Sequence, residues 1–242
     1  AGIGTSRLSE EDLPPEDNPL SDLPLDELSR ALCSPSKTFL YDRLGIWVAE
    51  SEGPVPDREP LGINALDQWQ VKDEVLRLVR AGDASLTTPE VLLQRFAGRG
   101  FLPLEAGGQA AADEALALVG AALSAWGDLG GATALPADDP ATAIRAEVDG
   151  LRLAGRADRV RQNHDGALLL EWFVAGSVGS GKRALRAWVH LLAACATVGP
   201  GVEIAGARVL GVHHKDTDTW LRAPSQQDAE GTLADLVAVW GA

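Results

Sequence analysis

The chain has 242 residues with an ordinary globular composition, 45% hydrophobic and 23% charged, so it can bury one large core or two smaller ones. Its formal net charge of −14 argues against nucleic-acid binding over the whole surface, although it leaves room for a local basic patch. No segment approaches the roughly 18 consecutive apolar residues that span a bilayer, so we expect no membrane partner.

Residues 1–24 are acidic and rich in proline, and we predict an extended strap or linker there because such sequence buries little apolar surface. This segment lacks the basic-then-apolar order of a secretory signal. The two cysteines, Cys33 and Cys195, stand far apart without a partner motif, which favours a reducing compartment over a disulfide framework. We therefore expect a cytoplasmic location.

Residues 25–130 are predicted to form a helical region. A short helix can start at Ser21 or Asp22 and end near Cys33, and a second can start at Pro35 with one apolar face. Helical spacing of apolar residues predicts further helices over 64–79, 88–97 and 109–126. The apolar face after Pro35 consists of Phe39, Leu40, Leu44 and Ile46.

Residues 131–242 are predicted to form an α/β core, integrated with the helical region into one domain. Strands are expected over 142–148, 151–160, 167–174 and 205–213, with a tight hairpin at Asp149-Gly150. Amphipathic helices are expected over 183–198 and 225–240. The order predicts a mixed sheet flanked by helices.

Two carboxylates mark the ends of two predicted strands. Asp158 and Glu171 occupy the positions at which a metal-dependent nuclease of the restriction-endonuclease-like, PD-(D/E)XK class holds Mg²⁺. The lysine that stabilises charge in such a site is replaced by Phe173, which has neither charge nor donor. We therefore predict a PD-(D/E)XK core that keeps a vestigial site, with no catalytic residue, no metal and no cofactor. The alternative is that Asp158 and Glu171 are ordinary acids at strand ends.

Basic residues gather around the same strands and the next helix. The candidate DNA-binding residues are Arg156, Arg159, Lys182, Arg183, Arg186 and His190. The alternative is a solvated helix face whose cations pair with some of the many acids.

Two further motifs resemble sites without completing one. His213 and His214 are adjacent on a strand, so their side chains point to opposite faces and do not share a metal. The segment from Gly176 to Lys182 fits part of a phosphate-binding loop, but Arg183 stands where the Mg²⁺-binding hydroxyl is needed. We predict a flexible loop there.

The segment Ser34-Pro35-Ser36-Lys37-Thr38-Phe39-Leu40-Tyr41-Asp42-Arg43-Leu44-Gly45-Ile46 resembles the Cys-Pro-x-x-Phe-x-x-x-x-Leu-Gly-Ile signature of RecB-family nuclease domains. Together with the segments 57–61 and 186–196, it makes the chain similar to the C-terminal domains of the RecC family, the gamma subunits of exodeoxyribonuclease V. The resemblance extends from about Leu25 to Trp240. Related iron–sulfur nucleases carry four cysteines around this domain, whereas here Ser34 replaces the first.

The resemblance implies a C-terminal fragment of a larger subunit, in a heterotrimer with RecB-like and RecD-like subunits and with DNA in the assembled complex. It implies an inactive nuclease-like domain that serves DNA repair and recombination by helping to separate the strands and to hold the partner subunits. Two alternatives remain open. The domain can be an active Mg²⁺ nuclease that uses Asp158, Glu171 and a migrated Lys182, or it can be a protein-interaction module without DNA contact, which the net charge favours.

Overall fold

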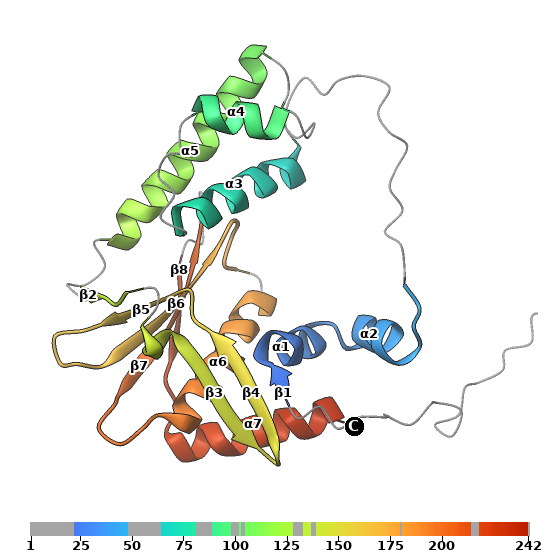
Figure 1. Cartoon of the computed structure of the whole chain (residues 1–242), viewed down its shortest axis with the longest axis vertical. Coiled ribbons are helices and arrows are strands. Elements are labelled where there is room, and N and C mark those ends of the chain that lie inside the picture. The colour runs from blue at the N-terminus through green and yellow to red at the C-terminus, as the bar shows by residue number, and fades with distance from the viewer. Residues whose placement is uncertain are drawn as a thin grey trace, which may run out of the picture.

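The computed structural model describes residues 22–47, 64–80, 89–97, 102, 105–127, 133–136, 139–179, 181–213 and 218–241 (Figure 1). These residues form a mixed α/β structure with two mixed sheets and seven α-helices. The mixed α/β class predicted from the sequence is therefore confirmed. Within the described residues, none of the helices has the length and apolar character needed to cross a membrane.

The smaller sheet has the strand order β1-β4-β3. Strands β3 (Ala143–Val148) and β4 (Leu151–Arg156) form the predicted hairpin, and the turn residues Asp149 and Gly150 have φ values of 50° and 80°. Such a two-residue turn with positive φ matches the right-handed twist of the strands it joins.

Strand β1 (Asp22–Pro24) runs parallel to β4 and corrects the predicted helix start at Ser21 or Asp22. Helix α1 (Leu25–Cys33) begins three residues later and ends where predicted. The reason is tertiary: pairing with β4 supplies partners for the backbone, and Leu23 becomes fully buried. The last three residues of the predicted strap thus form a strand, and residues 1–21 lie outside the described part of the chain.

The larger sheet has the strand order β2-β5-β6-β7-β8. Its strands are β2 (Thr133–Ala134), β5 (Arg159–Gln162), β6 (Leu168–Val174), β7 (Ile204–Gly211) and β8 (Asp218–Arg222). Helix α6 (Gly181–Thr197) makes the crossover between β6 and β7, the one parallel pair of this sheet.

The predicted single strand over 151–160 is divided between the two sheets. The break falls at Ala157 and Asp158, where the chain leaves β4 and enters β5. The Ala157 N–H donates to the Thr142 carbonyl, and the Asp158 N–H donates to the Glu171 carbonyl. Ala157 therefore bonds to the residue just before β3 of the smaller sheet, whereas Asp158 bonds to β6 of the larger sheet.

Two hydrophobic cores contact the larger sheet. The first packs α1, α6 and α7 (Gln226–Gly241) against both sheets. The second joins α3 (Ala65–Arg80), α4 (Pro89–Ala97) and α5 (Glu105–Gly127) to Ala175, Leu210 and Val212 at the ends of β6 and β7. Figure 1 shows α3, α4 and α5 gathered at one end of the sheet.

The segment after Pro35 differs from its predicted apolar packing. It forms the short helix α2 (Pro35–Thr38) and the π-helical turn η2 (Phe39–Arg43), and neither has a buried residue. Phe39 and Ile46 are 44% and 48% exposed.

A short 3₁₀ helix, η4 (Pro140–Thr142), precedes β3, and its N-cap Asp139 accepts a hydrogen bond from the Ala141 N–H.

Candidate functional site

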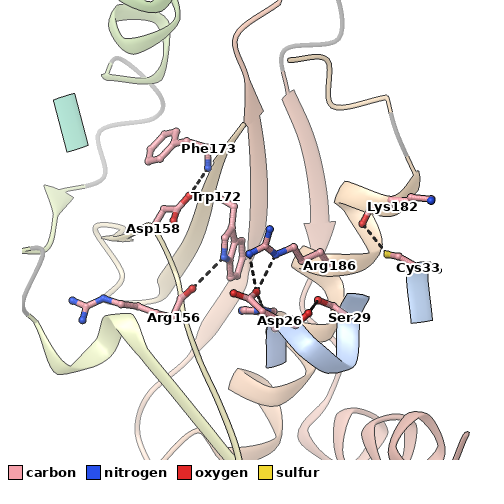
Figure 2. Close-up of polar contacts among 10 residues, drawn as sticks. Asp26, Ser29, Cys33, Arg156, Asp158, Trp172, Phe173, Lys182 and Arg186 are labelled. Carbon is pink, nitrogen blue, oxygen red and sulfur yellow. Dashed lines mark hydrogen bonds and ion pairs between the residues drawn. The ribbon is translucent and has the colours of Figure 1, made fainter. Parts of the chain in front are cut away.

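Asp158, the first carboxylate of the predicted site, lies between the two sheets and bonds to β6. Its Oδ2 accepts a hydrogen bond of 2.8 Å from the backbone N–H of Phe173 (Figure 2). Its own N–H donates to the Glu171 carbonyl at 3.0 Å. Asp158 therefore extends the ladder between β5 and β6 with both its main chain and its side chain.

Glu171, the second carboxylate, is fully buried and paired with an arginine. It stands opposite Arg159 in the register of β5 and β6, and Arg159 Nε lies 2.5 Å from Glu171 Oε2. A buried carboxylate without a partner is strongly unfavourable, so the Arg159 guanidinium offsets part of the cost of burying Glu171. Glu171 Oε1 has no hydrogen-bond partner among the described residues.

Phe173, which the sequence pattern sets at the lysine position, is a packing residue. Its side chain is half-buried and packs against the second core, which α3, α4 and α5 build. The guanidinium carbon of Arg159 lies 4.9 Å from the centre of its ring, a cation–π distance. One arginine thus contacts both Glu171 and Phe173.

Asp158 and Glu171 are the residues that would hold a divalent cation in a nuclease of this class. Mg²⁺ requires near-octahedral oxygen ligation, so both carboxylates would have to turn toward one ion. Here one carboxylate bonds to a backbone N–H and the other to a guanidinium. In the part of the chain that the structure describes, no three His, Cys, Asp or Glu side chains form a group that could hold a metal ion.

Lys182, the residue of the active-nuclease alternative, lies elsewhere. Its Nζ donates to Ser34 Oγ at 3.1 Å, and its carbonyl accepts a 3.5 Å hydrogen bond from the Cys33 thiol. Figure 2 shows Lys182 beside Cys33, at the opposite side of the view from Asp158. The structure does not bring Lys182 to the two carboxylates.

Two of the other predicted basic residues of α6 contact α1. Arg186 and His190 share the Asp26 carboxylate, with Arg186 Nη2 at 2.8 Å and His190 Nε2 at 3.0 Å from its Oδ1. The Arg183 guanidinium donates to the Ser177 carbonyl. The face of α6 that the sequence presents as basic is therefore partly neutralised by the acidic start of α1.

His190 is buried, at 2% exposure, and its ring meets the edge of Trp172 with centroids 5.5 Å apart. Burial lowers the pKa of His190, and Asp26 opposes this effect. The imidazole is therefore a packed, neutral group between α6 and α1, and it offers no surface to DNA. Of the other two predicted residues, Arg156 is exposed on β4, and Arg159 belongs to the Glu171 pair.

A groove of about 540 Å³ lies between α1 and the start of α6. Its charged lining consists of Arg30, Lys182, Arg183 and Arg186 together with Asp26 and Glu27. Four cations against two carboxylates leave an excess of two positive charges in a chain of net charge −14. This groove is the local basic patch that the composition left possible.

A family model of the RecC C-terminal domain matches residues 20–242. The chain belongs to the RecC C-terminal domain family. RecC is a component of the multisubunit RecBCD complex, exodeoxyribonuclease V, so membership links the chain to DNA repair and recombination, to partner subunits and to DNA.

Other comparisons add little to the RecC assignment. None of the curated proteins matches the chain. Among solved structures, one titled "Crystal structure of SSO0001" has 11% sequence identity and a TM-score of 0.31, covering 77% of this chain and 79% of that chain. A TM-score this low carries no argument about function.

The sequence reasoning missed one row of residues in this RecC domain. Arg159, Glu171, Arg208 and Trp220 stand opposite one another across β5, β6, β7 and β8. Paired residues of neighbouring strands share a face, so all four residues of the row lie on one face of the sheet. Arg208 stands alone among the apolar residues of β7, which was the one signal in the sequence.

Proposed function

We propose that this RecC C-terminal domain is a catalytically inactive, nuclease-like PD-(D/E)XK domain. It would serve the exodeoxyribonuclease V complex as a scaffold for DNA strand separation and subunit assembly. The observation that carries the proposal is the ion pair between Arg159 and Glu171, because a built-in guanidinium occupies the carboxylate that a metal would need.

Two neighbouring residues support inactivity. Phe173 supplies no charge to a phosphoryl centre, and its ring belongs to the packing of α3, α4 and α5. The Asp158 carboxylate accepts the Phe173 N–H and so helps to hold β6 in place. The vestigial site has thus acquired an architectural use, in which each former catalytic position joins secondary-structure elements.

The proposed DNA contact uses the exposed cations of the groove and of β4. Lys182, Arg183 and Arg186 line the groove, and Arg156 is exposed on β4. Such contacts to phosphates position DNA without reading its sequence. The proposed partners that hold the domain are the RecB-like and RecD-like subunits of the complex.

Inactivity is tested by incubating the chain with linear duplex and single-stranded DNA and with Mg²⁺ or Mn²⁺. We expect no cleavage above that of an Asp158→Ala variant. Cleavage that disappears in Asp158→Ala would overturn the proposal in favour of an active nuclease.

The groove is tested in the assembled complex by reversing three charges at once, with Lys182→Glu, Arg183→Glu and Arg186→Glu. Each lost phosphate contact should reduce the slope of log affinity against log salt by about 0.9 for duplex DNA. Arg77→Glu on α3 is the control, because Arg77 is an exposed arginine that is far from the groove in the chain and pairs with Glu74 of its own helix. Lost assembly with an unchanged salt slope would indicate a protein-interaction surface instead.

A further inference from the structure

We propose that Trp220, with Arg208 and Arg222, binds an unpaired nucleic-acid strand at the β8 edge of the larger sheet. The indole would stack on a base, and the arginines would meet the adjacent phosphates. The site is separate from the α1–α6 groove, and it depends on the family's link to DNA rather than on the proposed scaffold role.

Strand β8 presents one open face. Asp218, Trp220 and Arg222 alternate along it as exposed residues, while Thr219 and Leu221 between them are half-buried. Leu221 packs on the first core, so the exposed residues point to the other face, together with Arg208 of β7. Trp220 is 51% exposed although it is a large apolar side chain.

Gly206 and Arg208 hold the indole in position. A Cβ at Gly206 would lie 3.0 Å from Cζ2 of Trp220 and 2.5 Å from the Leu221 carbonyl oxygen. The ring therefore leans over a residue that has no side chain to displace it. The guanidinium carbon of Arg208 lies 5.8 Å from the ring centre, and Asp218 fixes this guanidinium with an ion pair. A fixed ring loses little conformational entropy when a base stacks on it.

The neighbours of Trp220 favour a nucleic acid over a protein partner. On its face of the sheet, its described neighbours on β7 and β8 are Gly206, Arg208, Asp218 and Arg222, and Leu210 opposite Asp218 is fully buried. Among the described residues of this face, the indole therefore belongs to no exposed apolar patch. A protein docking site needs such a patch around its anchor. With two arginines against one aspartate, this edge has a net charge of +1, and Arg222 has no ion pair among the described residues.

An unpaired strand fits this surface better than a duplex. Bases inside a duplex have their faces covered by their neighbours, whereas the bases of a single strand are free to stack on aromatic side chains. A tryptophan beside arginines is the usual combination in proteins that hold single strands without sequence preference.

The test measures binding of a fluorescein-labelled oligo(dT) strand to the full chain by anisotropy, over a series of salt concentrations. Trp220→Leu keeps an apolar side chain but removes stacking, and we expect it to weaken binding roughly 5- to 150-fold with an unchanged salt slope. Trp220→Phe should retain most of the affinity because it keeps an aromatic face. Arg222→Gln should lower the magnitude of the salt slope by about 0.7.

Trp47→Leu is the matched control, because Trp47 is 78% exposed but stacks on Tyr41 at the end of the η2 segment. It should bind oligo(dT) as tightly as the wild type. The proposal is overturned if the wild type does not bind, if Trp220→Leu binds normally, or if Trp220→Phe is as weak as Trp220→Leu. The charge-reversal variant of the groove changes other residues and is tested with duplex DNA. The two experiments are therefore independent, and either proposal can fail while the other holds.

Discussion

Arg159 and Glu171 form an ion pair in register across β5 and β6, with the carboxylate completely buried and the guanidinium 23% exposed. Arg159 directly follows Asp158 in the chain. Two consecutive residues therefore supply the first carboxylate of the nuclease-like pattern and the guanidinium that pairs with the second. The same guanidinium lies over the ring of Phe173. Through Arg159, the buried Glu171 carboxylate is thus connected to the packing of the helical region against Phe173.

Arg159→Ala should destabilise the fold by about 3–5 kcal/mol, because it leaves the Glu171 carboxylate buried without a partner. The measurement is the free energy of unfolding in urea. The double variant Arg159→Met with Glu171→Leu is the control, since replacing both partners by apolar groups of similar size is often nearly neutral. A single variant as stable as the wild type would contradict the assigned role of the pair.

Phe173→Ala should destabilise the fold by about 2 kcal/mol, below the 3–5 kcal/mol of a fully buried phenylalanine, because the ring is only half-buried. Phe173→Lys should cost at least as much and should not create nuclease activity, since the ammonium would stand beside Arg159. Denaturant unfolding and a Mg²⁺ cleavage assay check the two statements. Cleavage by Phe173→Lys would mean that the metal site is intact.

Asp158→Asn should change stability by less than about 0.5 kcal/mol, because an amide oxygen can accept the same hydrogen bond from the Phe173 N–H. Asp158→Ala removes the acceptor and should cost about 1–2 kcal/mol. Thermal melts of both variants make the comparison. Equal stability of the two would show that the Asp158 carboxylate does not support β6.

Gly155→Ala should destabilise the fold by about 1–3 kcal/mol through overpacking. A Cβ there would lie 2.7 Å from Cδ1 of Leu25 and 3.1 Å from Cε1 of His190, and both side chains are buried. Gly120→Ala on α5 is the control, because its Cβ would meet nothing within 4 Å. That change should stabilise the helix by up to about 1 kcal/mol, and both effects can be read from melting temperatures.

Stability should fall as the pH drops below about 6.5, the ordinary pKa of histidine. Burial has the largest effect on the pKa of His190 and lowers it. The Asp26 carboxylate raises this pKa and Arg186 lowers it by a smaller amount, so the net direction is downward. The unfolded chain then binds the proton at a higher pH than the folded chain, so acid favours unfolding. Urea unfolding of the wild type and His190→Gln from pH 8 to 5 should show a smaller loss below pH 6.5 in the variant. Parallel curves would contradict this.

The sequence by itself determined the kinds of elements and their order. The Asp149-Gly150 turn, the helical periodicity over 64–79 and the apolar run over 167–174 all depend on residues close in the chain. The structure has the corresponding elements, the β3–β4 turn, α3 and β6. The RecC resemblance was also readable from local motifs, and the family model confirmed it.

Only the tertiary structure decided which side chains meet. The sequence leaves open whether the basic face of α6 binds DNA or is solvated. In the structure, Asp26 at the start of α1 pairs with Arg186 and His190 on that face. The sequence predicts that Arg159 contacts DNA, whereas the register of β5 and β6 sets it opposite Glu171. Arg208 and Trp220 meet through the pairing of β7 with β8. A shift of one residue in register turns every side chain of a strand to the other face, so cross-strand partners follow from the packing of the whole sheet and not from local sequence.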